Sequence, residues 1–329
     1  MSDIVFEVKD LCVDYITGNN SYARAVDHVS FSIGKGQSLG LAGESGCGKS
    51  TIAYSLMRLH KPPAIISNGE ILFQGEDILK YDTKQLQAFR WRDTSMVFQS
   101  AMNCLNPVAT LEKQFYEIYR YHGVTKNKKE ARERSEELLA LVGIPKERLR
   151  DYPHQFSGGM RQRAVIAMAL ALNPKLIILD EPTTALDTVV QRDILRRIYD
   201  LKEKFGFSIL FITHDISLMM EFCDSMAVMY AGKIIEQASS QKILKSPCHP
   251  YTYGLKNSFP SLTGKIEYME GIPGSPLDLK KIPPGCRFES RCFCKQGNCG
   301  TEPPVKTVEG EGFFYCHYPL KQEEEASNG

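Results

Sequence analysis

The sequence predicts an α/β fold with a mainly parallel core sheet, an antiparallel side sheet, an inserted helical subdomain and a small Cys-rich C-terminal extension. Short apolar runs of strand length alternate with helical stretches, which is typical of a parallel sheet covered by helices. A charged helical segment interrupts this alternation in the middle of the chain. Five of the ten cysteines lie after residue 285, in a stretch rich in Pro and Gly.

The order of these patterns predicts where each part begins and ends. Apolar runs predict strands at 4–8, 29–33, 38–42, 70–73, 174–182 and 208–212, of which the early ones suit the side sheet. The charged helix formers of 126–141 stop at Gly143 and Pro145. We therefore expect an α/β core at 1–91 and 163–245, the helical subdomain at 92–162, and the extension at 246–329.

A phosphate-binding loop is predicted between the strand at 38–42 and the next helix. The run Gly43-Glu44-Ser45-Gly46-Cys47-Gly48-Lys49-Ser50-Thr51 fits Gly-x-x-x-x-Gly-Lys-Ser/Thr without a mismatch. Glycines let the backbone wrap around phosphate oxygens, and the helix adds the positive end of its dipole. We expect Lys49 to reach the β- and γ-phosphates and Ser50 to ligate Mg²⁺. The core is thus predicted to be a P-loop NTPase.

Two carboxylates end a later strand. In Leu176-Ile177-Ile178-Leu179-Asp180-Glu181, the strand tip places Asp180 to hold Mg²⁺, directly or through water. Glu181 points elsewhere and is expected to polarise the attacking water. With a phosphate loop upstream, this pair predicts hydrolysis of the triphosphate.

A second anion-binding device lies between these motifs. The run Gln155-Phe156-Ser157-Gly158-Gly159-Met160-Arg161-Gln162-Arg163 leads into an apolar helix, so a Ser-Gly-Gly turn stands at a helix N-terminus. One triphosphate does not need two such cradles on one chain. We therefore expect this turn to bind the nucleotide held by a partner's phosphate loop.

Together these motifs resemble the ATP-binding subunit of an ABC transporter, over about residues 4 to 320. Phe156-Ser157-Gly158-Gly159-Met160 corresponds to the signature motif, with Met160 where the general consensus has Gln, as in the peptide-importer branch. Gln99 matches the Q-loop glutamine, Asp187 in Ala185-Leu186-Asp187 matches the D-loop aspartate, and His214 matches the switch histidine that contacts the γ-phosphate.

The resemblance implies one composite ATP and Mg²⁺ site, with Glu181, His214 and Lys49 as the catalytic set. The residues expected to bind ATP on the same chain are Tyr15, Gly43, Glu44, Ser45, Gly46, Cys47, Gly48, Lys49, Ser50, Thr51, Gln99 and Asp180. Those expected to act across a dimer interface are Ser157, Gly158, Gly159 and Asp187. Mg²⁺ is expected on Ser50, Gln99 and Asp180. Tyr15 is the candidate for stacking on adenine and Tyr22 its rival, because the insertion 16–21 leaves the register open.

The C-terminal third is similar to oligopeptide and dipeptide importers, in Ser246-Pro247-Cys248-His249-Pro250-Tyr251-Thr252 and Gly271-Ile272-Pro273-Gly274-Ser275-Pro276. The resemblance implies an ATPase that drives peptide import together with a second ABC ATPase subunit, two transmembrane permease subunits and an extracytoplasmic substrate-binding protein. A heterodimer is expected. Nickel and oligosaccharides remain alternative cargoes. A soluble ABC ATPase in DNA repair or translation, and a metal- or redox-sensing module, are the alternatives from other classes.

Four cysteines of the extension form a candidate metal staple. Cys286, Cys292, Cys299 and Cys316 are separated by five, six and sixteen residues, gaps longer than the two to four of most zinc knuckles. Four thiolates of a [4Fe-4S] cluster tolerate such gaps, and the resemblance also implies that cluster; zinc is the alternative. Cys294 is a fifth cysteine, and an alternative set of ligands has Cys294 in place of Cys292 or Cys299. We expect the five cysteines elsewhere to pack in the core, and oxidation or alkylation of Cys47 to impair nucleotide binding.

The composition argues against a nucleic-acid-binding protein and against a membrane-spanning one. The 40 basic residues against 39 acidic ones leave no electrostatic footprint for nucleic acid. The longest apolar run has nine residues, fewer than the roughly 20 of a membrane helix, and no signal peptide is evident. We therefore expect a peripheral protein on the cytoplasmic face of the cell membrane. The acidic run at 323–325 is predicted to be disordered.

Overall fold

The computed structural model describes residues 4–18, 21–99, 103–183, 186–258, 271–308 and 312–320. The acidic run at 323–325 and Ala185 lie outside the described residues. The chain divides into two compact units: 1–6, 32–38 and 72–211 form the first, and 7–31, 39–71 and 212–329 form the second. Among the described residues, no helix has both the length and the apolar character that a bilayer crossing requires.

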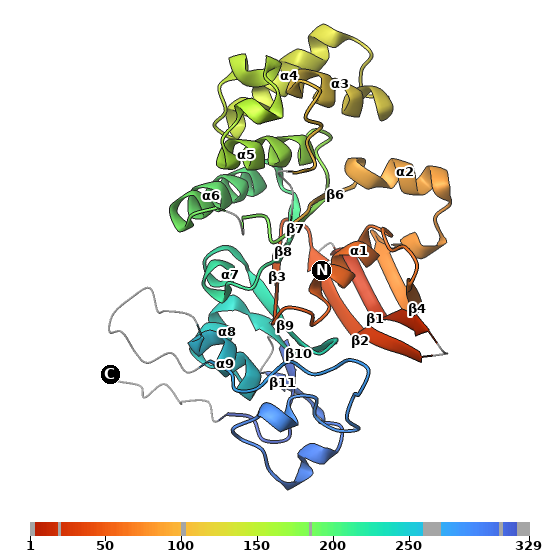
Figure 1. Cartoon of the computed structure of the whole chain (residues 1–329), viewed down its shortest axis with the longest axis vertical. Helices are drawn as coiled ribbons and strands as arrows, with labels where there is room; N and C mark the ends of the chain where they lie inside the picture. Colours follow the sequence, from red (N-terminus) through yellow and green to blue (C-terminus); the bar gives the residue numbers. More distant parts are fainter. Residues whose placement is uncertain are drawn as a thin grey trace. The chain divides into compact units, whose positions relative to one another are not determined.

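The chain order of the elements alternates strands and helices after an early run of strands, as predicted (Figure 1). The strands are β1 (Ile4–Gly18), β2 (Ser21–Gly34), β3 (Ser38–Ala42), β4 (Ala64–Phe73), β5 (Glu76–Asp77), β6 (Thr94–Val97), β7 (Leu176–Asp180), β8 (Ser208–Ile212), β9 (Ser225–Tyr230), β10 (Lys233–Ser239), β11 (Val305–Val308) and β12 (Gly312–Tyr315). The α-helices are α1 (Lys49–Leu56), α2 (Thr83–Arg92), α3 (Leu111–Tyr121), α4 (Lys128–Leu141), α5 (Gly158–Ala169), α6 (Thr188–Phe205), α7 (Ile216–Phe222), α8 (Ser240–Lys245) and α9 (Pro250–Asn257).

The first unit contains the sheet strands β8, β7 and β6, which are neighbours in that order. β6 and β7 run parallel, from Thr94 opposite Leu176 to Val97 opposite Leu179. Every residue of β7 and β8 is buried, and apart from Asp180 and Ser208 both strands are continuous apolar runs of the kind found in parallel sheets covered on both faces. The predicted strand at 208–212 is confirmed to the residue, and the one at 174–182 is shorter, at 176–180.

The helices α3, α4 and α5 of this unit gather together (Figure 1). Each begins at a side chain that accepts a backbone N–H: Thr110 for α3, Asn127 for α4 and Ser157 for α5. The segment predicted as helical, 92–162, also contains β6, so its first residues belong to the sheet. The helical part runs from α3 to the first turn of α5.

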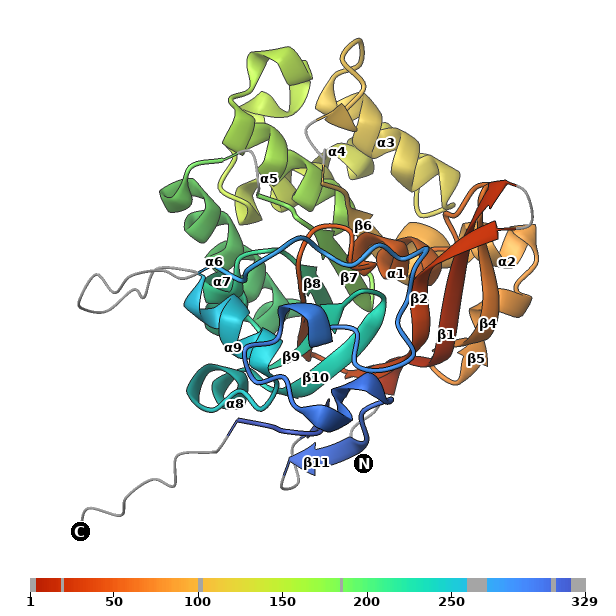
Figure 2. The same cartoon turned by 60° about the horizontal axis from the view of Figure 1, so that its bottom comes forward.

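The second unit is built around β3 and β9, which pair in parallel from Leu39 opposite Ser225 to Ala42 opposite Val228. Beyond β9 the strand order is β10, β12, β11, and these pairs are antiparallel. Two strands of the predicted extension thus continue the sheet of the second unit, with Phe314 opposite Glu236. Figure 2 shows α8 and α9 beside this sheet.

A separate sheet contains β2, β1, β4 and β5 in that order, of which β4 and β5 pair antiparallel. The predicted strands at 4–8, 29–33 and 70–73 lie inside β1, β2 and β4, which are all longer. The predicted runs are shorter because all three strands include polar residues on an exposed side, and a search for apolar runs stops at those residues. The predicted side sheet is therefore present.

Candidate active site

The phosphate loop joins β3 to α1 in the second unit. Its glycines Gly43, Gly46 and Gly48 have φ of +148°, +79° and +112°, a region that side chains rarely adopt. A Cβ on Gly48 would lie less than 3.0 Å from the carbonyl oxygen of Ala25. The loop therefore requires glycine on both conformational and steric grounds.

Lys49 is buried beneath the loop, with 6 % of its surface exposed. Its Nζ donates to the carbonyl oxygens of Gly43, at 2.6 Å, and Glu44, at 2.9 Å. The ammonium group is thus held by the backbone of the phosphate loop. When a triphosphate binds, a phosphate oxygen would replace one of these carbonyl oxygens as the hydrogen-bond acceptor of Lys49.

Cys47 is buried in the same loop, with 5 % exposed. Its Sγ lies 3.7 Å from Lys49 Nζ, and burial raises the pKa of the thiol above its usual range. Burial and a high pKa both slow the reaction of a thiol with oxidants and alkylating agents. These two properties therefore do not favour the expected loss of nucleotide binding by oxidation or alkylation of Cys47.

Tyr15 lies beside the start of α1. Its hydroxyl is 3.4 Å from Thr51 Oγ1, which brings the aromatic ring from β1 next to the phosphate loop. Tyr22 is 56 % exposed, and the guanidinium of Arg24 lies 5.6 Å from its ring centroid. Of the two candidates for stacking on adenine, Tyr15 is the one in contact with a residue of the loop.

The carboxylates predicted for catalysis lie in the first unit, at the end of β7. Asp180 is buried at the strand tip, with 2 % exposed. Glu181 follows with φ of +46°, an unusual conformation for a residue with a side chain. Gln99 Nε2 donates to Glu181 Oε2 at 2.7 Å. The structure thus brings together two residues that the sequence separates by 82 positions and that the motif analysis assigned to one site.

The signature residues are also in the first unit. Ser157 caps α5, its Oγ accepting from Met160 N at 3.3 Å, and Gly158 and Gly159 form the first turn. A Cβ on Gly159 would lie 3.1 Å from Val190 Cγ1, so the turn packs closely on α6. Asp187 caps α6, accepting from Val190 N at 3.0 Å. His214 is in the second unit, exposed, two residues after the end of β8.

Five cysteines line one cavity in the second unit: Cys286, Cys292, Cys294, Cys299 and Cys316. His249, Pro250, His317 and Tyr318 line it as well. Burial raises the pKa of Cys292 to about 11 and that of Cys316 to about 12. The cysteines predicted to form a cluster are therefore gathered in space, and Cys294 is among them. Of the five cysteines predicted to pack elsewhere, Cys104 is exposed and the other four are buried.

One ion pair was not foreseen from the sequence: the buried Arg291 of the extension is bonded to the partly exposed Glu44 of the phosphate loop, at 2.6 Å and 2.9 Å. Arg291 directly precedes Cys292, and a buried arginine requires a carboxylate partner. No local pattern indicates which carboxylate that is.

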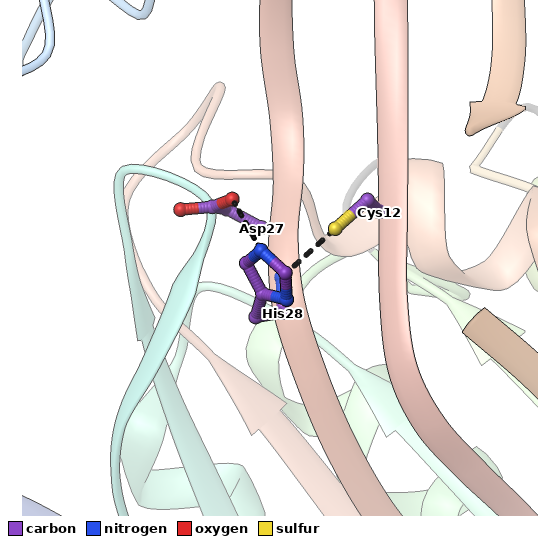
Figure 3. A group of neighbouring side chains, drawn as sticks. All are labelled: Cys12, Asp27 and His28. Atoms are coloured by element: carbon purple, nitrogen blue, oxygen red, sulfur yellow. Dashed lines mark hydrogen bonds and ion pairs between the residues drawn. The ribbon is translucent and has the colours of Figure 1, made fainter. Parts of the chain in front are cut away.

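A second group absent from the sequence analysis is formed by Cys12, Asp27 and His28 (Figure 3). His28 N donates to Cys12 Sγ at 3.3 Å, and His28 Nε2 lies 3.9 Å from Asp27 Oδ1. Asp27 is already paired with cationic side chains, which are those of Arg24, Lys233 and Arg287. Because these charges would repel a bound cation, we assign no metal to this group.

Comparison with known families identifies two regions of the chain. Residues 26–184 match the ABC transporter family, and residues 235–299 match the C-terminal region of oligopeptide/dipeptide transporters. The second match ends at Cys299, so it includes four of the five cavity cysteines.

Curated relatives cover nearly the whole chain. A probable peptide ABC transporter ATP-binding protein of Sinorhizobium fredii is 44 % identical, over 92 % of this chain and 91 % of its own. The oligopeptide transport ATP-binding protein OppD of Bacillus subtilis is 44 % identical, over 92 % and 86 %. The dipeptide transport ATP-binding protein DppD of Lactococcus lactis is 43 % identical, over 94 % and 89 %.

Among solved structures, a dimeric ATP-binding cassette in a post-hydrolysis state with ADP and phosphate is similar to this chain. The TM-score is 0.63 at 28 % identity, and the match covers 71 % of this chain and 98 % of that one. The similarity therefore spans a complete cassette and leaves part of this chain outside it.

Proposed function

Because this chain belongs to the ABC transporter ATP-binding proteins, in the oligopeptide/dipeptide branch, we propose that it is the ATP-hydrolysing subunit of a membrane importer of di- and oligopeptides. The observation that carries the proposal is the 44 % identity over 92 % of the chain to proteins named for peptide transport. The match of residues 235–299 to the C-terminal region of that branch supports the cargo class independently of the ATPase motifs.

The chemistry of the proposed site follows from the residues described above. The N–H groups of the phosphate loop and the Lys49 ammonium bind the phosphates, and Tyr15 stacks on adenine. The buried Asp180 carboxylate and the Ser50 hydroxyl are oxygen donors of the kind that Mg²⁺ prefers and would hold the ion, which when bound would supply positive charge to offset that of the β- and γ-phosphates. Glu181, held by Gln99, takes the proton of the attacking water, and His214 orients the γ-phosphate.

The second anion cradle supports a dimer as the active form. Ser157, Gly158 and Gly159 stand at the N-terminus of α5, so they suit the γ-phosphate of an ATP held by a partner subunit. In the proposed cycle two ATP molecules join the two subunits, Asp187 acts across the interface, and hydrolysis lets the subunits part. The partner is a second, related ATPase subunit.

The proposed assembly also contains two permease subunits and an extracytoplasmic substrate-binding protein, which bring this chain to the cytoplasmic face of the cell membrane. The region around Gln99 transmits the closing of the two ATPase subunits to the permeases.

The cysteine cavity is proposed to hold a [4Fe-4S] cluster on Cys286, Cys292, Cys299 and Cys316. Four thiolates on one zinc ion lie about 3.8 Å apart, since each Zn–S bond is about 2.3 Å long. Yet among the residues with described placement, no three cysteine sulfurs lie within 4.8 Å of one another. Thiols that share one cavity at wider spacing suit a larger inorganic cluster, whose chemistry here is structural or redox.

Uptake of a labelled tripeptide by cells that carry the chain or lack it tests the cargo. We expect uptake to require the chain and to be lost with Glu181→Gln. Uptake of nickel or an oligosaccharide in place of the peptide would assign the chain to another importer, and an absence of membrane partners on purification would remove it from transport.

Metal and acid-labile sulfide content of anaerobically purified protein tests the cluster. We expect about four irons and four sulfides per chain with broad absorption near 400 nm. Each of Cys286→Ser, Cys292→Ser, Cys299→Ser and Cys316→Ser should lose this signal, whereas Cys294→Ser should keep it. Stoichiometric zinc would contradict the cluster.

A further inference from the structure

The cysteine-rich segment (residues 286–299) is bonded to the phosphate loop through one side chain. The guanidinium of Arg291 donates to both carboxylate oxygens of Glu44, from Nη1 at 2.6 Å and from Nη2 at 2.9 Å. We propose that Arg291 is a positioning residue of the nucleotide site, through which the cysteine-rich segment sets the affinity of the phosphate loop for nucleoside triphosphate. The inference rests on the proposed function only in taking ATP as the ligand.

Arg291 is itself fixed from several directions. It is buried, with 7 % exposed, and its Nε donates to Pro273 O at 2.7 Å. Its guanidinium lies 5.8 Å from the ring centroid of Tyr230 and 5.9 Å from that of Phe288. A bidentate arginine so confined holds its carboxylate partner in one place, because little rotamer freedom remains on the arginine side.

Glu44 is held by its backbone as well. Its N–H donates to the hydroxyl of Tyr251 in α9 at 2.9 Å, and Tyr251 packs on Tyr230 with ring centroids 4.7 Å apart. The carbonyl oxygen of Glu44 in turn accepts from Lys49 Nζ at 2.9 Å. Tyr251 and Arg291, both in the extension, thus fix the N–H and the carboxylate of Glu44. The carbonyl oxygen of the same residue contacts the phosphate-binding Lys49.

The position of Arg291 depends on the cysteines around it. It ends a 3₁₀ turn, Glu289–Arg291, and is followed by Cys292. Glu289 N donates to Cys286 O at 3.0 Å, and Cys286 N donates to Cys299 O at 2.9 Å. Because the loop must present its N–H groups at fixed places, any loosening of this support raises the ordering cost of nucleotide binding.

The test is a double-mutant cycle with Arg291→Gln, Glu44→Gln and both together, on the full chain. The readouts are the dissociation constant for a fluorescent MgATP analogue, KM and kcat for ATP hydrolysis, and the thermal midpoint. Each single variant should weaken binding about tenfold and raise KM with kcat nearly unchanged. The double variant should bind the analogue no more weakly than the weaker-binding single variant. The dissociation constant of Arg291→Lys should lie between those of the unaltered chain and Arg291→Gln.

Two control variants come from the same segment. Lys295→Gln removes an exposed ion pair with Glu289 and should leave the dissociation constant unchanged. Arg287→Gln removes the other buried arginine, which pairs with Asp27, and should lower the thermal midpoint with an effect on binding independent of Glu44.

Independent effects of Arg291 and Glu44 in the cycle would overturn the proposal. If Arg291→Gln does not fold, Glu44→Gln and Arg291→Lys decide it, and unchanged binding in both would refute it. An unaltered chain that binds no MgATP would instead contradict the proposed function.

Discussion

Replacing Gly48 with alanine tests whether the phosphate loop is fixed by backbone contacts, because the expected cost has two separable parts. The first is conformational, since φ is +112° and a side chain in such a region costs about 1–2 kcal/mol. The second is steric, since the new Cβ would meet the carbonyl oxygen of Ala25, and overpacking of this kind costs about 1–3 kcal/mol. Because a backbone oxygen cannot rotate away, the loop must shift instead. We expect a loss of stability of about 3 kcal/mol and loss of nucleotide binding.

Gly36→Ala is the matched control. Gly36 also has a positive φ, +67°, but a Cβ there would have no atom within 4 Å, so only the conformational cost remains. Thermal denaturation should show a fall of about 6 °C for Gly48→Ala and about 2–3 °C for Gly36→Ala. MgATP binding should be lost only in the first. Equal thermal shifts with intact binding in both variants would refute the steric argument.

The remaining predictions concern catalysis and pH. Glu181→Gln should bind ATP but hydrolyse it about 10²–10⁴-fold more slowly, because the general base is lost. Retained turnover would refute the assignment of Glu181 as that base. His249 is buried and its Nδ1 accepts from Tyr251 N at 3.0 Å, and burial lowers its pKa to about 3. The unfolded chain binds this proton near pH 6.5, so the free energy of unfolding should fall by up to about 1.4 kcal/mol per pH unit as pH drops from about 6.5 towards 3. His249→Asn keeps an acceptor at the start of α9 and should flatten this dependence in denaturant titrations at pH 7 and 5; an unchanged slope would show that other groups cause it.

Features that depend on neighbouring residues could be predicted from the amino-acid sequence. β3 and β8 were predicted to the residue because a buried parallel strand is a continuous apolar run bounded by turns. The phosphate loop was equally clear, since its function requires glycines and a lysine at fixed spacing on one short stretch. The cysteines of the extension were also predicted to gather, and they line one cavity.

Features that join distant parts of the chain became evident only in the folded structure. The strand β6 falls inside a segment that reads as helical, and its identity depends on pairing with β7, which lies some 80 residues later. Glu44 and Arg291 are separated by 247 positions, so no periodicity or spacing connects them. Local propensity and motif chemistry act over a few residues, whereas strand pairing and the neutralisation of a buried arginine are settled only when the whole chain has packed.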